Sequence, residues 1–272
     1  MPVGFSARLY SSTGSTSRLA LCVTLLIGAA LLLAQQNQAQ QSHSRLAYAA
    51  DPANVPDAIA KVSSGQFGAV HLEMIANAHA VQAIPALEQQ FNVAHDLLTT
   101  TKIASTLVRL GDTNSSYWDF LVNQATLAIQ SPNPTLFDAD GQQVRGRTSS
   151  QFTAWAKTNK IPPDAVYLLP ALVAMLGETG DSRAIPLLRQ GLSSPNPFIQ
   201  AAAARGLANV HDTDSIPLII DACRKAPDWG AAAIARSLVY FDDPAAQSAV
   251  DTYIPANLAK TYRAEKTMGV KP

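Results

Sequence analysis

The sequence predicts an all-α fold, an α/α superhelix in which helical hairpins stack into a solenoid with one irregular insert. Two segments carry nearly the same residues thirty-one positions apart, AAAARGL at 201–207 and AAIARSL at 232–238. The same offset relates AIPLL at 184–188 to SIPLI at 215–219. A turn aspartate keeps this spacing, at Asp181, Asp212 and Asp243. A fixed period of this length is typical of stacked helix pairs.

Residues 1–39 have the layout of a secretory signal peptide. Arg8 and Arg18 precede an uncharged run at 19–34, LALCVTLLIGAALLLA, and a glutamine-rich polar tract follows. Ala34 and Ala39 are candidate cleavage positions. The run has sixteen residues, and a spanning helix needs roughly 17 to 25, so an uncleaved single-pass anchor is the alternative. In both cases we expect the body of the chain to be exported, periplasmic or secreted.

The charge balance argues against a nucleic-acid partner. The chain has 20 Lys and Arg against 20 Asp and Glu, and without the two leader arginines the balance is 18 minus 20, or −2. Because nucleic-acid binding needs a basic surface, a nearly neutral chain gives no electrostatic reason to expect it. Membrane contact is expected only through residues 19–34, if they are not cleaved.

The body of the chain divides into a polar linker, a repeat region and a tail. We expect the linker at 40–57, the solenoid at 58–265 and the tail at 266–272, with the fold beginning near Asp57. The last segment of the solenoid, 255–266, is more charged than the preceding helices, which is typical of a capping repeat that shields the final apolar face.

Each repeat unit is predicted to contain two helices. In the clearest unit, the first helix spans 183–192 and the second 197–210, since the prolines of SSPNP at 193–197 cannot lie within one helix. The next unit has helices at 215–225 and 229–240. Apolar residues follow helical spacing, which predicts one buried stripe per helix. Cys223, the cysteine that remains after the leader, is expected in such a stripe.

Proline and aspartate mark the starts of the first helices. Three prolines are expected in the first turn of a helix, where a missing amide hydrogen costs little. They are Pro85, Pro186 and Pro217. Asp181 and Asp212 precede the same helices and are predicted to cap their free amides.

The repeated segments resemble a known family. The stretch IQAAAARGLANVHD at 199–212, followed by SIPL at 215–218, resembles the HEAT repeat in its short bacterial form, V-R-x-A-A-x-A-L-G-x-x-G-D-x-x-A-V-P-x-L. LGETGD at 176–181 is similar to the same pattern, with weaker echoes at 107–112 and 83–87. Two departures are Gln200, where the family usually has arginine, and His211, which replaces the turn glycine.

This resemblance implies how the second helices are used. In such solenoids the second helices line the inner, concave side. Arg205 and Arg236, which lie on second helices, are therefore candidate contacts with a partner protein. The alternative for both arginines is an intramolecular ion pair with a turn aspartate.

The regular spacing breaks once, and the break predicts an insert. Asp112 and Asp181 are sixty-nine residues apart, against sixty-two for two periods, and the segment 131–163 lacks a helical stripe for most of its length. LFDADGQQV at 136–144 suggests a tight hairpin, and 151–157 a short helix. Long loops in compact folds are often functional. The candidate partner contacts here are Phe137, Asp138, Asp140, Arg145, Arg147 and Trp155.

The sequence carries no pattern that predicts a metal site, a cofactor or a catalytic residue. Asp138 and Asp140 resemble the start of a calcium loop, but GRTSSQF at 146–152 lacks the required downstream glutamate. No two histidines have the four-residue spacing of a helical zinc site, and no Gly-x-Ser-x-Gly elbow occurs. We therefore predict that the protein is not an enzyme.

The function predicted from the sequence is a non-catalytic, exported scaffold for protein–protein interaction, using the concave face and the insert at 131–163. Two alternatives stay open. One is a lyase-like or accessory enzyme that acts on a partner protein, because some short bacterial HEAT proteins resemble phycobilin lyases. The other is a membrane-tethered subunit of an envelope complex.

Overall fold

A computed structural model describes residues 51–94, 96–131 and 168–272. The helices described below lie in one compact unit, Pro52–Pro272. The described residues form helices and turns and contain no strand, which confirms the all-α prediction. Within these ranges, no helix is both long and apolar enough to cross a bilayer.

The described helices pair in chain order into six hairpins. They are α2 (Val55–Ser63) with α3 (Ala69–Asn77), α4 (Ile84–Val93) with α5 (Leu97–Arg109), α6 (Ser115–Gln130) with α9 (Leu168–Glu178), α10 (Ile185–Gly191) with α11 (Pro197–Asn209), α12 (Ile216–Lys225) with α13 (Asp228–Ala235), and α14 (Pro244–Tyr253) with α15 (Ala256–Thr267). The predicted insert therefore falls inside the third hairpin, between α6 and α9.

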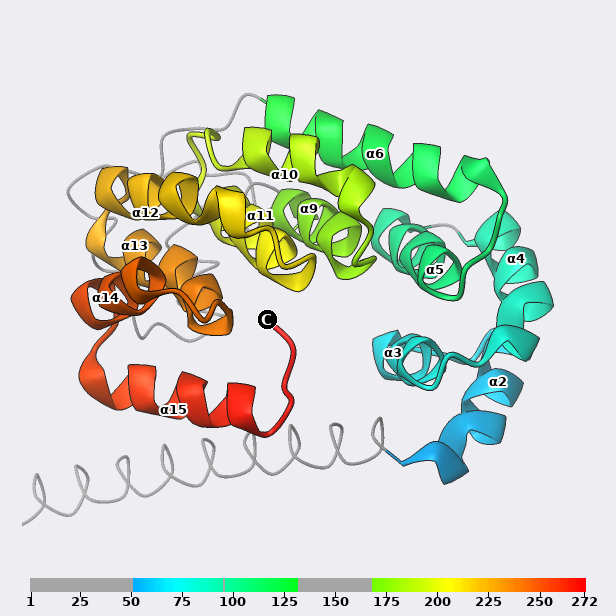
Figure 1. The fold of residues 1–272 in the computed structure, drawn as a ribbon. Helices are drawn as coiled ribbons and strands as arrows, with labels where there is room; N and C mark the ends of the chain where they lie inside the picture. The colour runs from blue at the N-terminus through cyan, green and yellow to red at the C-terminus, as the bar shows by residue number, and fades with distance from the viewer. Residues whose placement is uncertain (1–50, 95, 132–167) are drawn as a thin grey trace, which may run out of the picture. The chain divides into compact units, whose positions relative to one another are not determined.

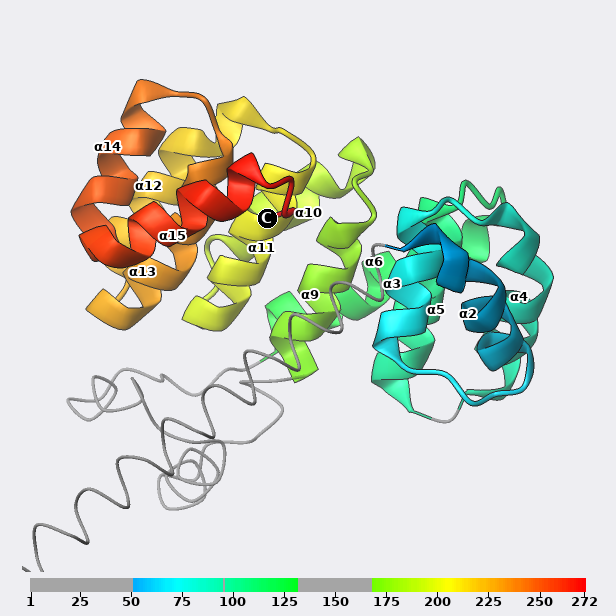
Figure 2. The same ribbon diagram turned by 90° about the horizontal axis from the view of Figure 1, so that it is seen from below.

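The second helices of the hairpins form a continuous row. Within Pro52–Pro272, Figure 1 shows α3, α5, α9 and α11 on the inner side and the first helices on the outer side. Contacts run in order from α3 to α5, α9, α11 and α13. Helix α15 packs against α14 and against η6 (Arg236–Tyr240), the 3-10 turn that follows α13, at the end of the row (Figure 2).

The repeat period reappears in the core. Leucines at one position of the repeat are fully buried: Leu107, Leu176 and Leu207 on second helices and Leu238 in η6, directly after α13. On the first helices, Leu188, Ile219 and Val250 follow the same thirty-one-residue offset and are equally buried. Because each helix buries only one stripe, the core is a layer between the two rows rather than one central cluster. Cys223 lies in this layer, as predicted.

The helix starts agree with the proline prediction and correct the aspartate prediction in part. The three predicted prolines lie at the first or second position of a first helix: Pro85 in α4, Pro186 in α10 and Pro217 in α12. Each of these helices follows a short 3-10 turn, namely η2 (Val81–Ala83), η4 (Ser182–Ala184) and η5 (Thr213–Ser215).

The two predicted aspartate caps differ in outcome. The Asp181 carboxylate accepts a hydrogen bond from the Arg183 amide at 2.9 Å, so it caps as predicted. Asp212 does not cap.

Asp212 instead holds two side chains together. Its carboxylate accepts hydrogen bonds from Arg189 on α10, at 2.8 and 3.0 Å, and from the Ser215 hydroxyl. The Arg189 guanidinium and the buried Ser215 hydroxyl take up the oxygens that would otherwise face the helix amides. The prediction of a cap at Asp212 was therefore wrong.

The ends of the second helices share a left-handed turn residue. Gly111 and Gly180 have φ of 79° and 69°, and His211, at the position where the family has glycine, has φ of 55°. His79 at the end of α3 has φ of 50°. A left-handed residue at this position lets the chain turn sharply from the end of one hairpin into the first helix of the following one. The two histidines therefore adopt the backbone conformation that glycine has at Gly111 and Gly180.

Three boundaries differ from the predicted ones. The second helix predicted at 229–240 changes at Arg236 into the 3-10 turn η6, where the Ser237 hydroxyl donates to the Ile234 carbonyl at 2.8 Å. Helix α2 begins at Val55, inside the predicted linker 40–57, because Pro56 favours a helix start and Val55 is buried. Helix α15 extends to Thr267, just into the predicted tail at 266–272.

Two glycines bring α9 and α11 into close contact. A Cβ added to Gly177 would lie 2.5 Å from the Gly206 Cα, and one added to Gly206 would lie 2.9 Å from the Gly177 Cα. Any side chain at either position would push the two helices apart. This contact sets the spacing of the second helices at the centre of the row.

Candidate functional site

The exposed side of the second helices places equivalent residues next to one another. Counting thirty-one residues along the chain, Ala171, Ala202 and Ala233 are equivalent on α9, α11 and α13. Glu178, Asn209 and Tyr240 form a second equivalent set, and Arg205 and Arg236 a pair. We call this side of the row the inner face.

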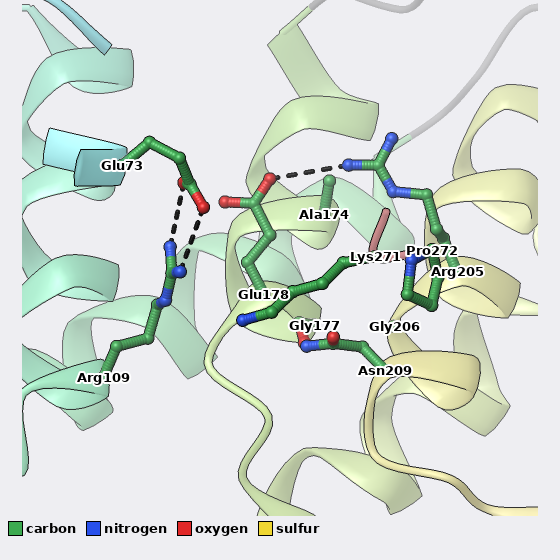
Figure 3. A pocket seen from close by; sticks show the side chains of 10 residues that line it. All are labelled: Glu73, Arg109, Ala174, Gly177, Glu178, Arg205, Gly206, Asn209, Lys271 and Pro272. Carbon is green, nitrogen blue, oxygen red and sulfur yellow. Dashed lines mark hydrogen bonds and ion pairs between the residues drawn. The ribbon is translucent and has the colours of Figure 1, made fainter. Parts of the chain in front are cut away.

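Ion pairs at one end of the inner face tie α3 to α5. Arg109 on α5 donates to both oxygens of Glu73 on α3, at 2.9 and 3.0 Å (Figure 3), and to Asn77 at 2.8 Å. Lys102 on α5 also donates to Glu73, at 3.1 Å. Burial raises the pKa of Glu73, but the Arg109 hydrogen bonds and the charges of Lys102 and Arg109 outweigh it and lower that pKa to about 2. The Glu73 carboxylate is therefore ionised at neutral pH.

The same network continues to α9 and α11. Lys102 bridges from Glu73 to Glu178 on α9. Glu178 also accepts a 3.5 Å hydrogen bond from Arg205 on α11, drawn in Figure 3. The Asn209 amide donates to the Gly177 carbonyl at 2.9 Å. Charged side chains thus run without interruption across four second helices.

The last residues of the chain lie on this polar part of the face. Lys271 and Pro272 line a cavity of about 210 Å³ together with Glu73, Arg109, Arg205 and Asn209 (Figure 3). The Tyr240 hydroxyl donates to the Lys271 carbonyl at 3.1 Å, which fastens the segment.

A second cavity, of about 640 Å³, opens beside the first over α9, α11 and α13. Its floor consists of alanines that are half-buried or exposed: Ala171, Ala174, Ala201, Ala202, Ala232 and Ala233. Larger side chains border it, among them Met175, Phe198, Leu258 and Tyr262. We call this cavity the alanine groove. Glu178 and Arg205 line both cavities, so the polar and apolar parts of the face are continuous.

The two predicted arginines lie side by side at the alanine groove. Arg236 donates to Glu265 on α15 at 3.2 Å and stacks over the Tyr262 ring at 4.5 Å. The side chains of Arg205 and Arg236 are 47% and 43% exposed. Both pair with glutamates of other helices rather than with the turn aspartates that the sequence suggested. Each therefore keeps an exposed guanidinium at the groove.

The other predicted contact residues lie outside the described part of the chain. These are Phe137, Asp138, Asp140, Arg145, Arg147 and Trp155. Sequence reasoning also missed residues that build the face: Glu73, Lys102, Arg109 and Glu178. Glu178 could have been found from the sequence, because the thirty-one-residue offset relates it to Asn209 and Tyr240. Glu73 and Lys102 have no such repeat-related signal in the sequence.

The described residues carry one free thiol, Cys223, and no cluster of metal-binding side chains. Within these ranges, no three His, Cys, Asp or Glu side chains come together as a metal site would require. Burial raises the pKa of the Cys223 thiol to about 12, so this sulfur stays protonated at neutral pH. What the inner face offers to a ligand is exposed guanidinium groups and small apolar side chains.

The fold and this face define a helical repeat protein of the HEAT-like solenoid class. Residues 166–250 match the family model of HEAT repeats, so this part of the chain is similar to HEAT repeats. No curated protein and no solved structure gives a significant match.

Proposed function

We propose that the protein is an exported, non-catalytic scaffold that binds a partner protein through its inner face and the insert at 131–163. The observation that carries the proposal is the pair of exposed arginines at the alanine groove. HEAT-like solenoids use their extended inner surfaces for protein binding. Exposed apolar surface beside partly exposed arginines is typical of a protein-binding surface, because a partner can cover the apolar part and pair with the guanidinium groups.

Export is supported by the sequence alone. Arg8 and Arg18 followed by the apolar run at 19–34 have the layout of a signal peptide. If the run is retained, the protein is instead a tethered subunit of an envelope complex. The mass of the purified protein distinguishes the two, because cleavage near Ala34 or Ala39 removes the leader.

The test of scaffolding is affinity capture from envelope extracts with four baits. They are the unchanged chain, an Arg205→Glu/Arg236→Glu variant, a variant lacking 134–160, and an outer-helix control, Arg224→Glu/Lys225→Glu. A protein captured by the unchanged chain and the control but lost with either of the other baits supports the scaffold.

Two results would count against it. Equal capture by all four baits would place any binding elsewhere on the chain. A pigment or small molecule that copurifies without a protein partner would favour the lyase-like alternative.

A further inference from the structure

We propose that the alanine groove binds an amphipathic helix of the partner protein, with large apolar side chains on one face and carboxylates along one edge. This inference rests on the proposed function and names the class of partner segment.

The groove is shaped to receive large apolar side chains. Three successive second helices each contribute two alanines to its floor: Ala171 and Ala174 on α9, Ala201 and Ala202 on α11, and Ala232 and Ala233 on α13. Larger side chains also line the groove, among them Met175 on α9, Phe198 on α11, and Leu258 and Tyr262 on α15. A cavity of about 640 Å³ falls in the range of roughly 300–1,000 Å³ that ligand sites occupy. A ridge of leucine-sized side chains would fill it.

The charge at the groove selects a carboxylate. Three charged residues line it, Glu178, Arg205 and Arg236, which leaves one positive charge in excess. Just outside the groove, Lys102 pairs with Glu178 and Glu265 pairs with Arg236, so these two further charges cancel and the excess stays at one. In the described part of the chain, each of the two arginines donates a single hydrogen bond, although a guanidinium has five N–H groups. The remaining donors suit the paired oxygens of Asp or Glu.

The surrounding elements favour a helix over an extended peptide. The groove is lined by helices, whose backbone groups bond within each helix, and it offers no strand edge to pair with. A helical ligand satisfies its own backbone and docks by side chains at i, i+3, i+4 and i+7.

The spacing of the arginines matches a helix that crosses the row. Arg205 and Arg236 occupy equivalent positions of neighbouring second helices, and packed helices lie about 8–10 Å apart. Carboxylates at i and i+7 of a crossing helix are about 10.5 Å apart. One edge of such a helix would present a carboxylate to each guanidinium while its apolar face covers the alanines.

The experiment measures fluorescence anisotropy of a labelled 18-residue peptide titrated with the full chain. The peptide carries leucines at i, i+4, i+7 and i+11 and glutamates at i+1 and i+8, and a second peptide has lysines in place of the glutamates. We expect the acidic peptide to bind at low salt, and the lysine peptide to bind at least about tenfold more weakly, which corresponds to about 1.4 kcal/mol.

Two groove variants and one control locate the binding. Arg205→Glu/Arg236→Glu should weaken the acidic peptide at least tenfold and improve the lysine peptide. Ala233→Trp, at an exposed position of the floor, should weaken both. Arg224→Glu/Lys225→Glu, on the exposed side of α12, should change neither. Thermal unfolding followed by circular dichroism checks that each variant is folded.

Three outcomes overturn the inference. They are no binding of the acidic peptide, equal binding of both peptides to the unchanged chain, or equal binding of the acidic peptide to the groove variants. Binding of dodecanoate that Ala233→Trp abolishes, without binding of the acidic peptide, would make the groove a small-molecule site. Capture of a protein that depends on Arg205 and Arg236 would then still uphold the scaffold, so the two proposals fail separately.

Discussion

At the scale of single residues, the Glu73 carboxylate joins the helices of the inner face through hydrogen bonds to two cations. It accepts hydrogen bonds from Arg109 and Lys102, and Lys102 passes the connection on to Glu178. One carboxylate thus links α3 to α5 directly and to α9 through a lysine. Removing it would leave two cations without their shared partner.

The lowered pKa of Glu73 predicts a particular response to acid. Its pKa is about 2 in the folded chain and 4.5 when unperturbed. The ionised Glu73 carboxylate therefore stabilises the folded chain fully above pH 4.5, and this stabilisation is lost as the pH falls toward 2. Glu73→Gln should unfold at a lower temperature at neutral pH and lose less stability than the unchanged chain between pH 4.5 and 2. Melting temperatures across that range test this, with Asp119→Asn on α6 as an exposed control; parallel curves for Glu73→Gln and the unchanged chain would contradict it.

Cys223 should be unreactive while the chain is folded. Burial raises the pKa of its thiol to about 12, and the thiolate is the reactive form. In a Cys22→Ser chain, which keeps only this thiol, we expect Ellman's reagent to react slowly in buffer and at once in denaturant. Fast reaction in buffer would mean that α12 opens readily.

At the scale of elements, the contact between α9 and α11 depends on the absence of two side chains. Gly177→Ala would place a Cβ 2.5 Å from the Gly206 Cα. Alanine favours a helix by roughly 0.5–1 kcal/mol over glycine, but overpacking costs typically about 1–3 kcal/mol. We expect net destabilisation by about 1–2 kcal/mol in urea unfolding. Gly68→Ala is the control for overpacking, because its added Cβ meets nothing within 4 Å; Gly68 is the N-cap of α3, where alanine is disfavoured, so a smaller loss than for Gly177→Ala is expected.

The turn after each second helix offers an opposite pair of substitutions. His211 has φ of 55° and Gly180 has φ of 69°. His211→Gly should stabilise the chain by up to about 1 kcal/mol, because glycine adopts this conformation without strain, and Gly180→Ala should destabilise it by about the same amount. Shifts of the urea midpoint in the same direction for both variants would show that backbone strain is not the cause.

The thirty-one-residue period predicted the helices and turn residues that recur in each hairpin. It could not predict side-chain contacts that occur at one place only. The helices at 183–192 and 197–210 and the prolines at their starts follow from local chemistry that recurs every thirty-one residues. Lys102 and Glu178 lie 76 positions apart and meet only through the stacking of α5 on α9. A cap was predicted at Asp212 because it precedes a first helix, as Asp181 does, and only the packing of α10 brings Arg189 to it.

At the scale of the whole unit, Pro52–Pro272 is a row of stacked helical hairpins without one central hydrophobic core. Contacts join each hairpin mainly to the next one along. Stability in such an arrangement is close to a sum of local terms, so the ends can open without the middle. Helix α11 is packed between α9 and α13, whereas α15 buries only Ala259.

This difference predicts a gradient of hydrogen exchange. Backbone amides of α15 should exchange about tenfold or more faster than those of α11, because opening a terminal helix breaks fewer contacts. Exchange followed by mass spectrometry of peptides from 197–209 and 256–267 measures both. Equal protection of the two helices would show that the row unfolds as one body.

The position of Lys271 and Pro272 also matters for how this protein is handled. Both line the same cavity as Glu73 and Asn209, and the Tyr240 hydroxyl donates to the Lys271 carbonyl. A purification tag fused after Pro272 would begin on the inner face, next to Arg205, and would obstruct the surface that a binding assay is meant to probe. Immobilisation is better achieved through an affinity sequence inserted just ahead of Pro52.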